Sequence, residues 1–172
     1  MPDHPAETQL PHPDLDEARI AALLLAYLSA DYRWGHHGSW HDVLIALPTP
    51  GLELAYPQAR SFGLLSAWNP GSVERPLDVN RAADEALQAE LETSGIRCLP
   101  AFASASNRTW REPSWLVFGM SVGASDALAA RYGQVGTLWG QPHLPVGLRL
   151  PAARPTRSCT STWPTAPARW AA

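Results

Sequence analysis

Two of the three asparagines in the chain, Asn69 and Asn80, lie in one short region. Asn80 lies seven residues before Leu87 and eleven before Leu91 on a predicted helix, which places it on the apolar stripe of that helix. A carboxamide that faces a core needs hydrogen-bond partners, and the strand end that carries Asn69 is the nearest part of the chain. Ligands often bind where strand ends meet helix N-termini, so the pair predicts a polar site. The alternative is that Asn69 caps a turn and Asn80 ties this turn to the helix.

The carboxylate of Glu112 is the candidate acid or base. It stands in the segment WREPSW, where the two-residue alternation of a strand puts Glu112 and Ser114 on one side, at the rim of a buried surface. Burial raises the pKa of such a carboxyl and suits it to proton transfer. The alternative is a structural ion pair with an arginine such as Arg81 or Arg111.

A third polar side chain, Gln134, directly follows Gly133, which is expected to end a helix. Its amide either completes a cluster with the residues above or caps that helix. We expect a small polar or nucleotide-like ligand to be bound by a polar cluster flanked by an aromatic ring, and we name its members the predicted cluster: Trp68, Asn69, Asn80, Arg81, Glu112, Ser114 and Gln134. Glu112 is the catalytic candidate, and the ligand is expected to be held by the others.

Other chemistries are excluded or weakly indicated. The chain has no lysine, which rules out a Schiff base and the lysine of a phosphate-binding loop, and it has no nucleophile elbow, H-E-x-x-H or G-x-G-x-x-G. His36, His37 and His41 straddle a predicted hairpin, where a solvated loop is favoured over a metal site. Cys98 and Cys159 cannot build a disulfide framework. We therefore expect neither a metal nor a cofactor.

The length of the chain predicts one domain, and its charge gives no strong signal for nucleic-acid binding. The 172 residues suffice for a single core, and the net charge of −3 leaves no broad basic surface for duplex nucleic acid, although a local arginine groove stays open. No signal peptide or membrane-spanning stretch is visible, and two cysteines suit a reducing compartment, so the sequence predicts a cytoplasmic protein.

The apolar pattern predicts a single α+β domain over residues 13–150, with a mixed sheet of about five to seven strands and about three helices. Ser61 to Trp68 has apolar residues on both faces, as a central covered strand does. Residues 48–60, which hold three prolines, are expected to form a loop. Helices are expected at 13–29 with Asp14 as cap, 76–94 and 124–132, and the other strands at 31–35, 40–47, 97–103, 114–120, 137–139 and 146–150.

Both ends of the chain are expected to be disordered. Residues 1–12 are polar and proline-bearing, and residues 151–172 are rich in Pro, Ala, Thr and Arg without periodicity. The composition of 151–172 departs sharply from that of the domain, which suggests a frame-shifted reading of a GC-rich gene as one hypothesis for this tail.

The order of several motifs carries a family resemblance. The run FGLLSAWNP with Asn80 after it, then WREPSWLV, RYGQ and TLW, resembles the bacterial family known as domain of unknown function 3293, over roughly residues 22–150. The resemblance implies an intracellular bacterial protein with a small α/β-type domain, and it implies no activity. It points to the same positions as the spacing argument, namely Trp68, Asn69, Asn80, Glu112, Ser114 and Gln134.

The expected function is therefore binding, with turnover as an extension, of a small molecule by the predicted cluster, because amides and one carboxylate suit recognition better than nucleophilic attack. Whether the protein is an enzyme is left open. The alternative is a protein-interaction or regulatory module, in which the cluster is a structural hydrogen-bond network and exposed tryptophans bind a partner.

Overall fold

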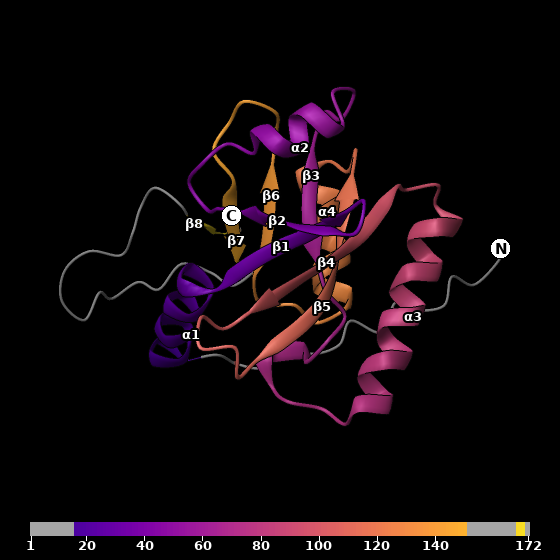
Figure 1. Cartoon of the computed structure of the whole chain (residues 1–172). Helices are drawn as coiled ribbons and strands as arrows, with labels where there is room; N and C mark the ends of the chain where they lie inside the picture. The colour runs from indigo at the N-terminus through magenta and orange to yellow at the C-terminus, as the bar shows by residue number, and fades with distance from the viewer. Residues whose placement is uncertain (1–15, 151–167, 171–172) are drawn as a thin grey trace, which may run out of the picture.

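The computed structural model describes residues 16–150 and the backbone of residues 168–170 (Figure 1). Within them a single sheet of eight strands has the order β2-β1-β4-β5-β3-β6-β7-β8. The pairs are antiparallel except for β7 with β8, so the sheet is mixed. The strands are β1 Asp31–His36, β2 Ser39–Val43, β3 Phe62–Leu65, β4 Cys98–Ser104, β5 Arg111–Phe118, β6 Thr137–Gly140, β7 Gly147–Leu150 and β8 Ala168–Trp170.

Strand β3 is central, as its apolar run predicts. All four of its residues are buried, and it pairs with β5 on one side and β6 on the other. Leu64 belongs to a core shared with α1 (Glu17–Ser29) and α2 (Pro50–Ala55), whereas Leu65 belongs to one shared with α3 (Leu77–Thr93) and α4 (Val122–Arg131). The sheet is therefore covered by helices on both faces, and the predicted α+β class is confirmed.

Helix α3 agrees with the prediction in its bounds and its buried face. Asn80, Leu87 and Leu91 are its buried residues, and Gly95 after it has a φ of 67°, a left-handed conformation that glycine adopts without strain. Helix α4 is capped by Ser121, whose side chain accepts from the Ala124 N–H.

Apart from shifts of one to three residues at the ends of elements, as in β5 and α4, four details differ from the expectation. Residues 50–55 of the predicted loop form helix α2, because Pro50 occupies its first turn and Leu52 supplies a buried anchor. Helix α1 begins after Asp16, which accepts from the Arg19 N–H at 2.7 Å, so the cap is Asp16; Asp14 lies outside the described residues. Strand β2 ends at Val43, and Ile45 makes only an isolated bridge to Val146.

The fourth difference is β8, a short strand parallel to β7 within the segment expected to be disordered. It raises the strand count above the expected five to seven. The expectations for residues 1–15, 151–167 and 171–172 lie outside the described residues. In the described part of the chain, no helix has the length and apolarity needed to cross a membrane.

Candidate ligand cavity between helix α1 and the sheet

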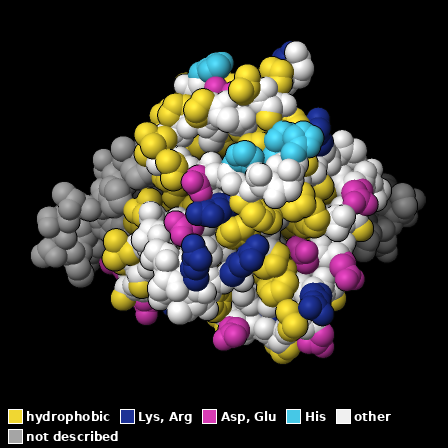
Figure 2. All heavy atoms as spheres, viewed as in Figure 1, with side chains coloured by type: hydrophobic (Ala, Val, Ile, Leu, Met, Phe, Trp, Pro, Cys, Tyr) yellow, Lys and Arg dark blue, Asp and Glu magenta, His cyan; other side chains and the backbone are white. Residues whose placement is uncertain are grey.

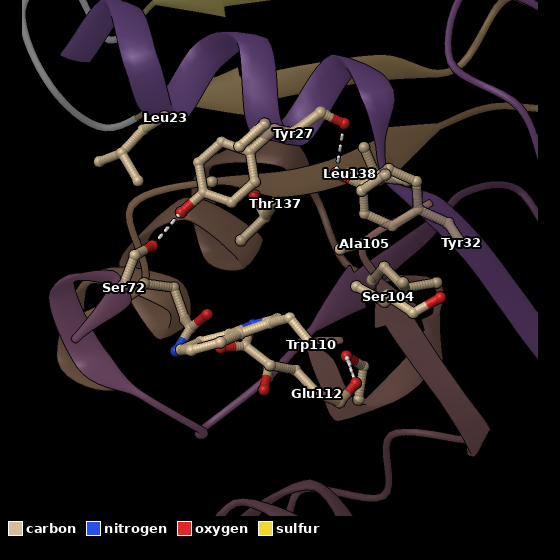
Figure 3. Close-up of a pocket in the computed structure, with 18 residues that line it drawn as sticks. Leu23, Tyr27, Tyr32, Ser72, Ser104, Ala105, Trp110, Glu112, Thr137 and Leu138 are labelled. Carbon is tan, nitrogen blue, oxygen red and sulfur yellow. Dashed lines mark hydrogen bonds between the residues drawn. The ribbon is translucent and has the colours of Figure 1, made fainter. Parts of the chain in front are cut away.

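A cavity of about 300 Å³ lies between α1 and the sheet, at the end where β3 and β4 finish and β5 and β6 begin (Figure 3). We call it the α1 cavity. Alternation along the strands brings Ser66, Ser114 and Glu112 to this side. Helix α1 and its neighbours supply an apolar wall, and strand ends supply polar groups. Its lining is Leu23, Ala26, Tyr27, Ala30, Tyr32, Leu64, Ser66, Ser72, Ala103, Ser104, Ala105, Trp110, Glu112, Ser114, Gln134, Gly136, Thr137 and Leu138.

Glu112 is the one carboxylate in this lining. Burial raises its pKa, and hydrogen bonds from the side chains of Asn69 and Trp110 offset part of that rise. The Asn69 bond joins Nδ2 to Oε1 over 2.9 Å. The expected alternative, an ion pair with Arg81 or Arg111, is not formed, because Arg111 points to the other face of β5 and Arg81 is exposed on α3. The Glu112 carboxylate therefore lines the cavity, and within the described residues it has no ion pair with a cation.

Two tyrosines that sequence reasoning did not select form the wall opposite Trp110 and Glu112 (Figure 3). The Tyr27 hydroxyl lies 2.5 Å from Ser72 Oγ, and the Tyr32 hydroxyl donates to the Tyr27 carbonyl over 2.8 Å. Burial raises the pKa of Tyr27 to about 12 and also raises the pKa of Tyr32. Both phenols stay neutral at physiological pH, and their own hydrogen bonds hold their rings in place.

Three polar groups of the lining keep hydrogen-bonding capacity. Gln134 donates from Nε2 to the Trp68 carbonyl over 2.9 Å, which leaves its side-chain oxygen unengaged. The hydroxyls of Ser104 and Thr137 have no hydrogen-bond partner within the described residues, although both side chains are buried. A ligand in the cavity can therefore be met by one carboxylate, one amide oxygen and two hydroxyls.

Asn69 and Asn80 come together as predicted, but in a network of their own. Asn69 has a left-handed backbone with φ 47°, and its N–H donates to Asn80 Oδ1 over 2.9 Å. Asn80 Nδ2 donates to Asn69 Oδ1 over 2.8 Å and to the Arg75 carbonyl over 3.2 Å, and the Arg75 N–H donates to Asn69 Oδ1 over 3.0 Å. The amides tie the turn after β3 to helix α3, and Asn69 extends the network to Glu112.

The predicted cluster is thus divided by the fold. Glu112, Ser114 and Gln134 line the α1 cavity, and Asn69 and Asn80 stand behind Glu112. The remaining two residues do not line it. Arg81 is exposed on α3, and Trp68 is half-buried, with its carbonyl accepting from Gln134 and its indole Nε1 buried without a partner.

The residues that sequence reasoning missed come mainly from α1 and from the ends of β1 and β4. Tyr27 lies at helical spacing with Leu23 and Leu24 in the first predicted helix, and Trp110 opens the segment WREPSW, but neither pattern indicates a cavity. A buried tyrosine requires a partner for its hydroxyl, which is the only sequence signal that sets Tyr27 apart from Leu23 and Leu24.

The histidines of the β1–β2 hairpin form an aromatic group with Trp34 and Tyr56, and His36 Nδ1 lies 3.0 Å from the Tyr56 hydroxyl. His37 and Gly38 make the tight turn, with φ values of 47° and 79°. Among the described residues, no three His, Cys, Asp or Glu side chains are placed to hold a metal ion.

A family model described as Protein of unknown function (DUF3293) matches residues 65–136. The matched stretch runs from the last residue of β3 to the residue before β6, and it contains the whole predicted cluster. Helix α1, which closes the cavity, precedes it. No curated protein and no solved structure matches the chain. The motif resemblance is confirmed over residues 65–136, where the chain is similar to the domain of unknown function 3293.

Proposed function

We propose that the protein binds a small molecule in the α1 cavity through a hydrogen-bond donor or cationic group placed on Glu112. The observation that carries the proposal is a largely buried carboxylate that lines an apolar cavity and has no basic partner within the described residues. A buried charge without a counter-ion costs stability, and a ligand that donates to it removes that cost. A buried carboxylate without a counter-ion is therefore typical of a site that selects its ligand.

The lining also constrains the charge of the ligand. No arginine or histidine is among the lining residues, and the chain has no lysine. A phosphate placed there would find no cation among the lining residues and would lie near Glu112, because the Arg19 guanidinium donates to the Ser72 carbonyl and is not itself part of the lining. The sequence predicts a small polar or nucleotide-like ligand. Within that class, the lining favours a nucleobase, a nucleoside or an aromatic amine. It disfavours a ligand that places a phosphate inside the cavity.

The shape of the cavity supports a planar ligand. A volume of about 300 Å³ holds one or two fused rings with short substituents. The rings of Tyr27 and Trp110 lie on opposite sides of the space in Figure 3, where each offers an aromatic surface. Glu112, Thr137 and Gln134 are then at the rim of the bound ring, where exocyclic amino and carbonyl groups need partners.

Binding is better supported than turnover. The titratable side chains of the lining are Glu112 and the neutral phenols of Tyr27 and Tyr32, and no cysteine, histidine or second carboxylate stands beside Glu112 as a partner in acid–base or nucleophilic chemistry. The raised pKa of Glu112 suits it to donate or accept one proton. We include turnover by a single proton transfer as an extension of the binding proposal.

A thermal-shift screen of the full chain tests the proposal, with nucleobases, nucleosides, aromatic amines and the matching phosphorylated compounds as probes. Hits are then measured by calorimetry against Glu112→Gln and Thr137→Val, which remove a charge and a hydroxyl with little change in shape. Glu85→Gln, an exposed carboxylate on α3, is the matched control. We expect unphosphorylated ring compounds to bind, Glu112→Gln to weaken them about tenfold or more, and the control to bind normally.

The second candidate function is a protein-interaction or regulatory module. The observation that favours it is the Asn69–Asn80 network, in which both carboxamides already have protein partners and need no ligand. On this view Glu112 is the end of a structural network. A screen without hits, or hits that bind Glu112→Gln and the Glu85→Gln control alike, would favour the module over the ligand site.

We place either function in the bacterial cytoplasm. Support comes from Cys98, a free thiol in the described part of the chain, and from the family resemblance, which implies an intracellular bacterial protein.

A further inference from the structure

A second concavity lies on the opposite face of the sheet, over β1, β2 and β4. Helices α3 and α4 pack against β5, β3 and β6 on that face, and the residues of β1, β2 and β4 beyond them carry long charged and aromatic side chains. Figure 2 shows this face, where arginine side chains (dark blue) gather beside hydrophobic side chains (yellow). The concavity measures about 370 Å³ and is called here the arginine groove; its lining is Asp31, Arg33, Trp40, Phe102, Ser104, Arg108 and Arg111.

Two aromatic rings make a platform in this groove. Trp40 pairs with Gly35 in the hairpin register, and its indole lies close to β1, since a Cβ on Gly35 would be in van der Waals contact with the ring at 3.4 Å. The ring reaches Phe102 on β4, with centroids 4.7 Å apart in an edge-to-face arrangement. Trp40 is nevertheless 46% exposed. The Arg111 guanidinium carbon lies 5.9 Å from the Trp40 ring centroid. An indole that is this exposed and has an arginine beside it is suited to stacking with a planar anionic group.

The positive charge of the groove is not fully neutralised. Arg33 pairs with Asp42, with Nε 2.9 Å from Oδ1, and Asp31 adds a carboxylate. Arg108 and Arg111 form no ion pair with a carboxylate in the described part of the chain. The guanidinium carbon of Arg111 stands 4.0 Å from the Phe102 ring centroid, which holds the group at the surface with its N–H donors free for an anion.

We propose that the arginine groove binds single-stranded nucleic acid, with a base stacked on Trp40 and backbone phosphates on Arg108 and Arg111. Aromatic rings interleaved with arginines on an open sheet face provide the stacking and the backbone contacts that single strands use. A duplex does not meet both requirements, because its bases are stacked on one another. The net charge of −3 does not oppose a local contact strongly, since charges farther away than about 8 Å are screened at physiological salt.

The groove is independent of the function proposed for the α1 cavity. Along β5, Arg111 lines the groove and Glu112 lines the cavity, and their variants report on separate sites. Loss of oligonucleotide binding with small-molecule binding intact, or the reverse, therefore tells which of the two proposals fails.

The test is fluorescence anisotropy of the full chain with labelled oligothymidylate and oligouridylate of about 12 nucleotides, at two or more salt concentrations. We expect Trp40→Ala to weaken binding about tenfold or more and Trp40→Phe to restore most of it, because a ring remains for stacking. Arg108→Ala and Arg111→Ala should each weaken binding and lower the slope of log K against log salt by about 0.7. Arg131→Ala, which removes an arginine from α4, is the matched control for charge.

Circular dichroism and thermal melts establish that each variant is folded. If the folded Trp40→Ala and Arg111→Ala variants bind as the unchanged protein does, or if Arg131→Ala weakens binding as much as Arg111→Ala, the groove is not the site. Equal affinity for a duplex of the same sequence overturns the stacking argument, and absence of binding at low salt overturns the proposal as a whole.

Discussion

Arg111 and Glu112 are neighbours in β5, yet their side chains serve opposite faces of the sheet. Among the residues that the structure describes, the Glu112 carboxylate in the α1 cavity forms no ion pair with a cation, and the Arg111 guanidinium in the arginine groove forms none with a carboxylate. Strand geometry forbids the two charges from meeting, because consecutive side chains of a strand point in opposite directions. These two neighbouring residues therefore place a negative charge at the α1 cavity and a positive charge at the arginine groove.

Replacing Glu112 by glutamine should stabilise the protein at neutral and alkaline pH. Because burial raises the pKa of Glu112 in the folded state, the folded protein holds this proton to higher pH than the unfolded chain does. Stability then falls as the pH rises from the ordinary glutamate range through the folded-state pKa. Glu112→Gln lacks this titration and keeps an oxygen for Asn69. Its melting temperature should exceed that of the unchanged protein at about pH 8, and the two should converge near pH 4.

Glu85→Gln serves as the control for this titration, because Glu85 is exposed on α3. At about pH 8 its melting temperature should equal that of the unchanged protein, because an exposed carboxylate makes little difference to stability. A Glu112→Gln variant that melts below the unchanged protein at about pH 8 would mean that the ionised carboxylate is a net stabilising partner of Asn69 and Trp110.

Replacing Asn80 by leucine should destabilise the fold by about 2–4 kcal/mol. The change removes the acceptor of the Asn69 N–H and the donor to Asn69 Oδ1 and to the Arg75 carbonyl. The buried Asn69 N–H is left without its partner, whereas Asn69 Oδ1 keeps only the bond from the Arg75 N–H. Urea denaturation measures the loss, and Gln58→Ala, which removes a carboxamide at an exposed position, should change stability by no more than about 0.5 kcal/mol. A loss below about 1 kcal/mol would show that water replaces the lost partners and that the network is not structural.

The apolar patterns of single elements predict much of the fold. The stripe of Asn80, Leu87 and Leu91 locates the buried face of α3, and the two-sided apolar run of β3 locates the centre of the sheet. In both cases the spacing of apolar residues within one element predicts which residues are buried. Helix α2 escapes this reasoning because its six residues are too few for a periodic signal, and its prolines equally suit a loop.

The site is only partly predictable for a different reason. Glu112, Ser114 and Gln134 reveal themselves as polar residues in apolar surroundings, and they do line the cavity. The cavity itself depends on how far α1 stands from the sheet, and no residue of α1 encodes that distance alone. The partner of Glu112 is likewise set by tertiary structure, because the pairing of β3 with β5 brings Asn69, in the turn after β3, to its carboxylate.

Replacing Tyr27 by phenylalanine should cost about 1 kcal/mol at neutral pH, because the hydrogen bond that joins α1 to Ser72 in the turn after β3 is lost. The variant should also resist alkali better than the unchanged protein. The folded-state pKa of Tyr27 is raised from 10.0 to about 12, so its contribution is present below pH 10 and is lost as the pH rises through about 12. Thermal melts between pH 7 and pH 12 compare the two proteins. Tyr132→Phe is the control, because the pKa of Tyr132 is also raised to about 12 and its side chain does not line the cavity.

The last prediction concerns Gly136, which lets the Tyr27 ring lie against the start of β6. A Cβ on Gly136 would stand 2.6 Å from Tyr27 Cε2, a distance that forces the ring to move. Gly136→Ala should therefore destabilise the protein by about 1–3 kcal/mol. In a Tyr27→Leu background the same change should cost much less, because the ring that it displaces is gone. Urea denaturation of the four proteins in this cycle gives the coupling between the two positions.

Gly123→Ala is the matched control, since a Cβ on Gly123 meets open space in the first turn of α4. Alanine is the better helix former, so this variant should be as stable as the unchanged protein or up to about 1 kcal/mol more stable. If Gly136→Ala proves as harmless as Gly123→Ala, the Tyr27 ring has room to shift toward the cavity. The wall that Tyr27 forms would then be adjustable, and ligand selection would rest on Glu112 and the hydroxyls rather than on the width between Tyr27 and Trp110.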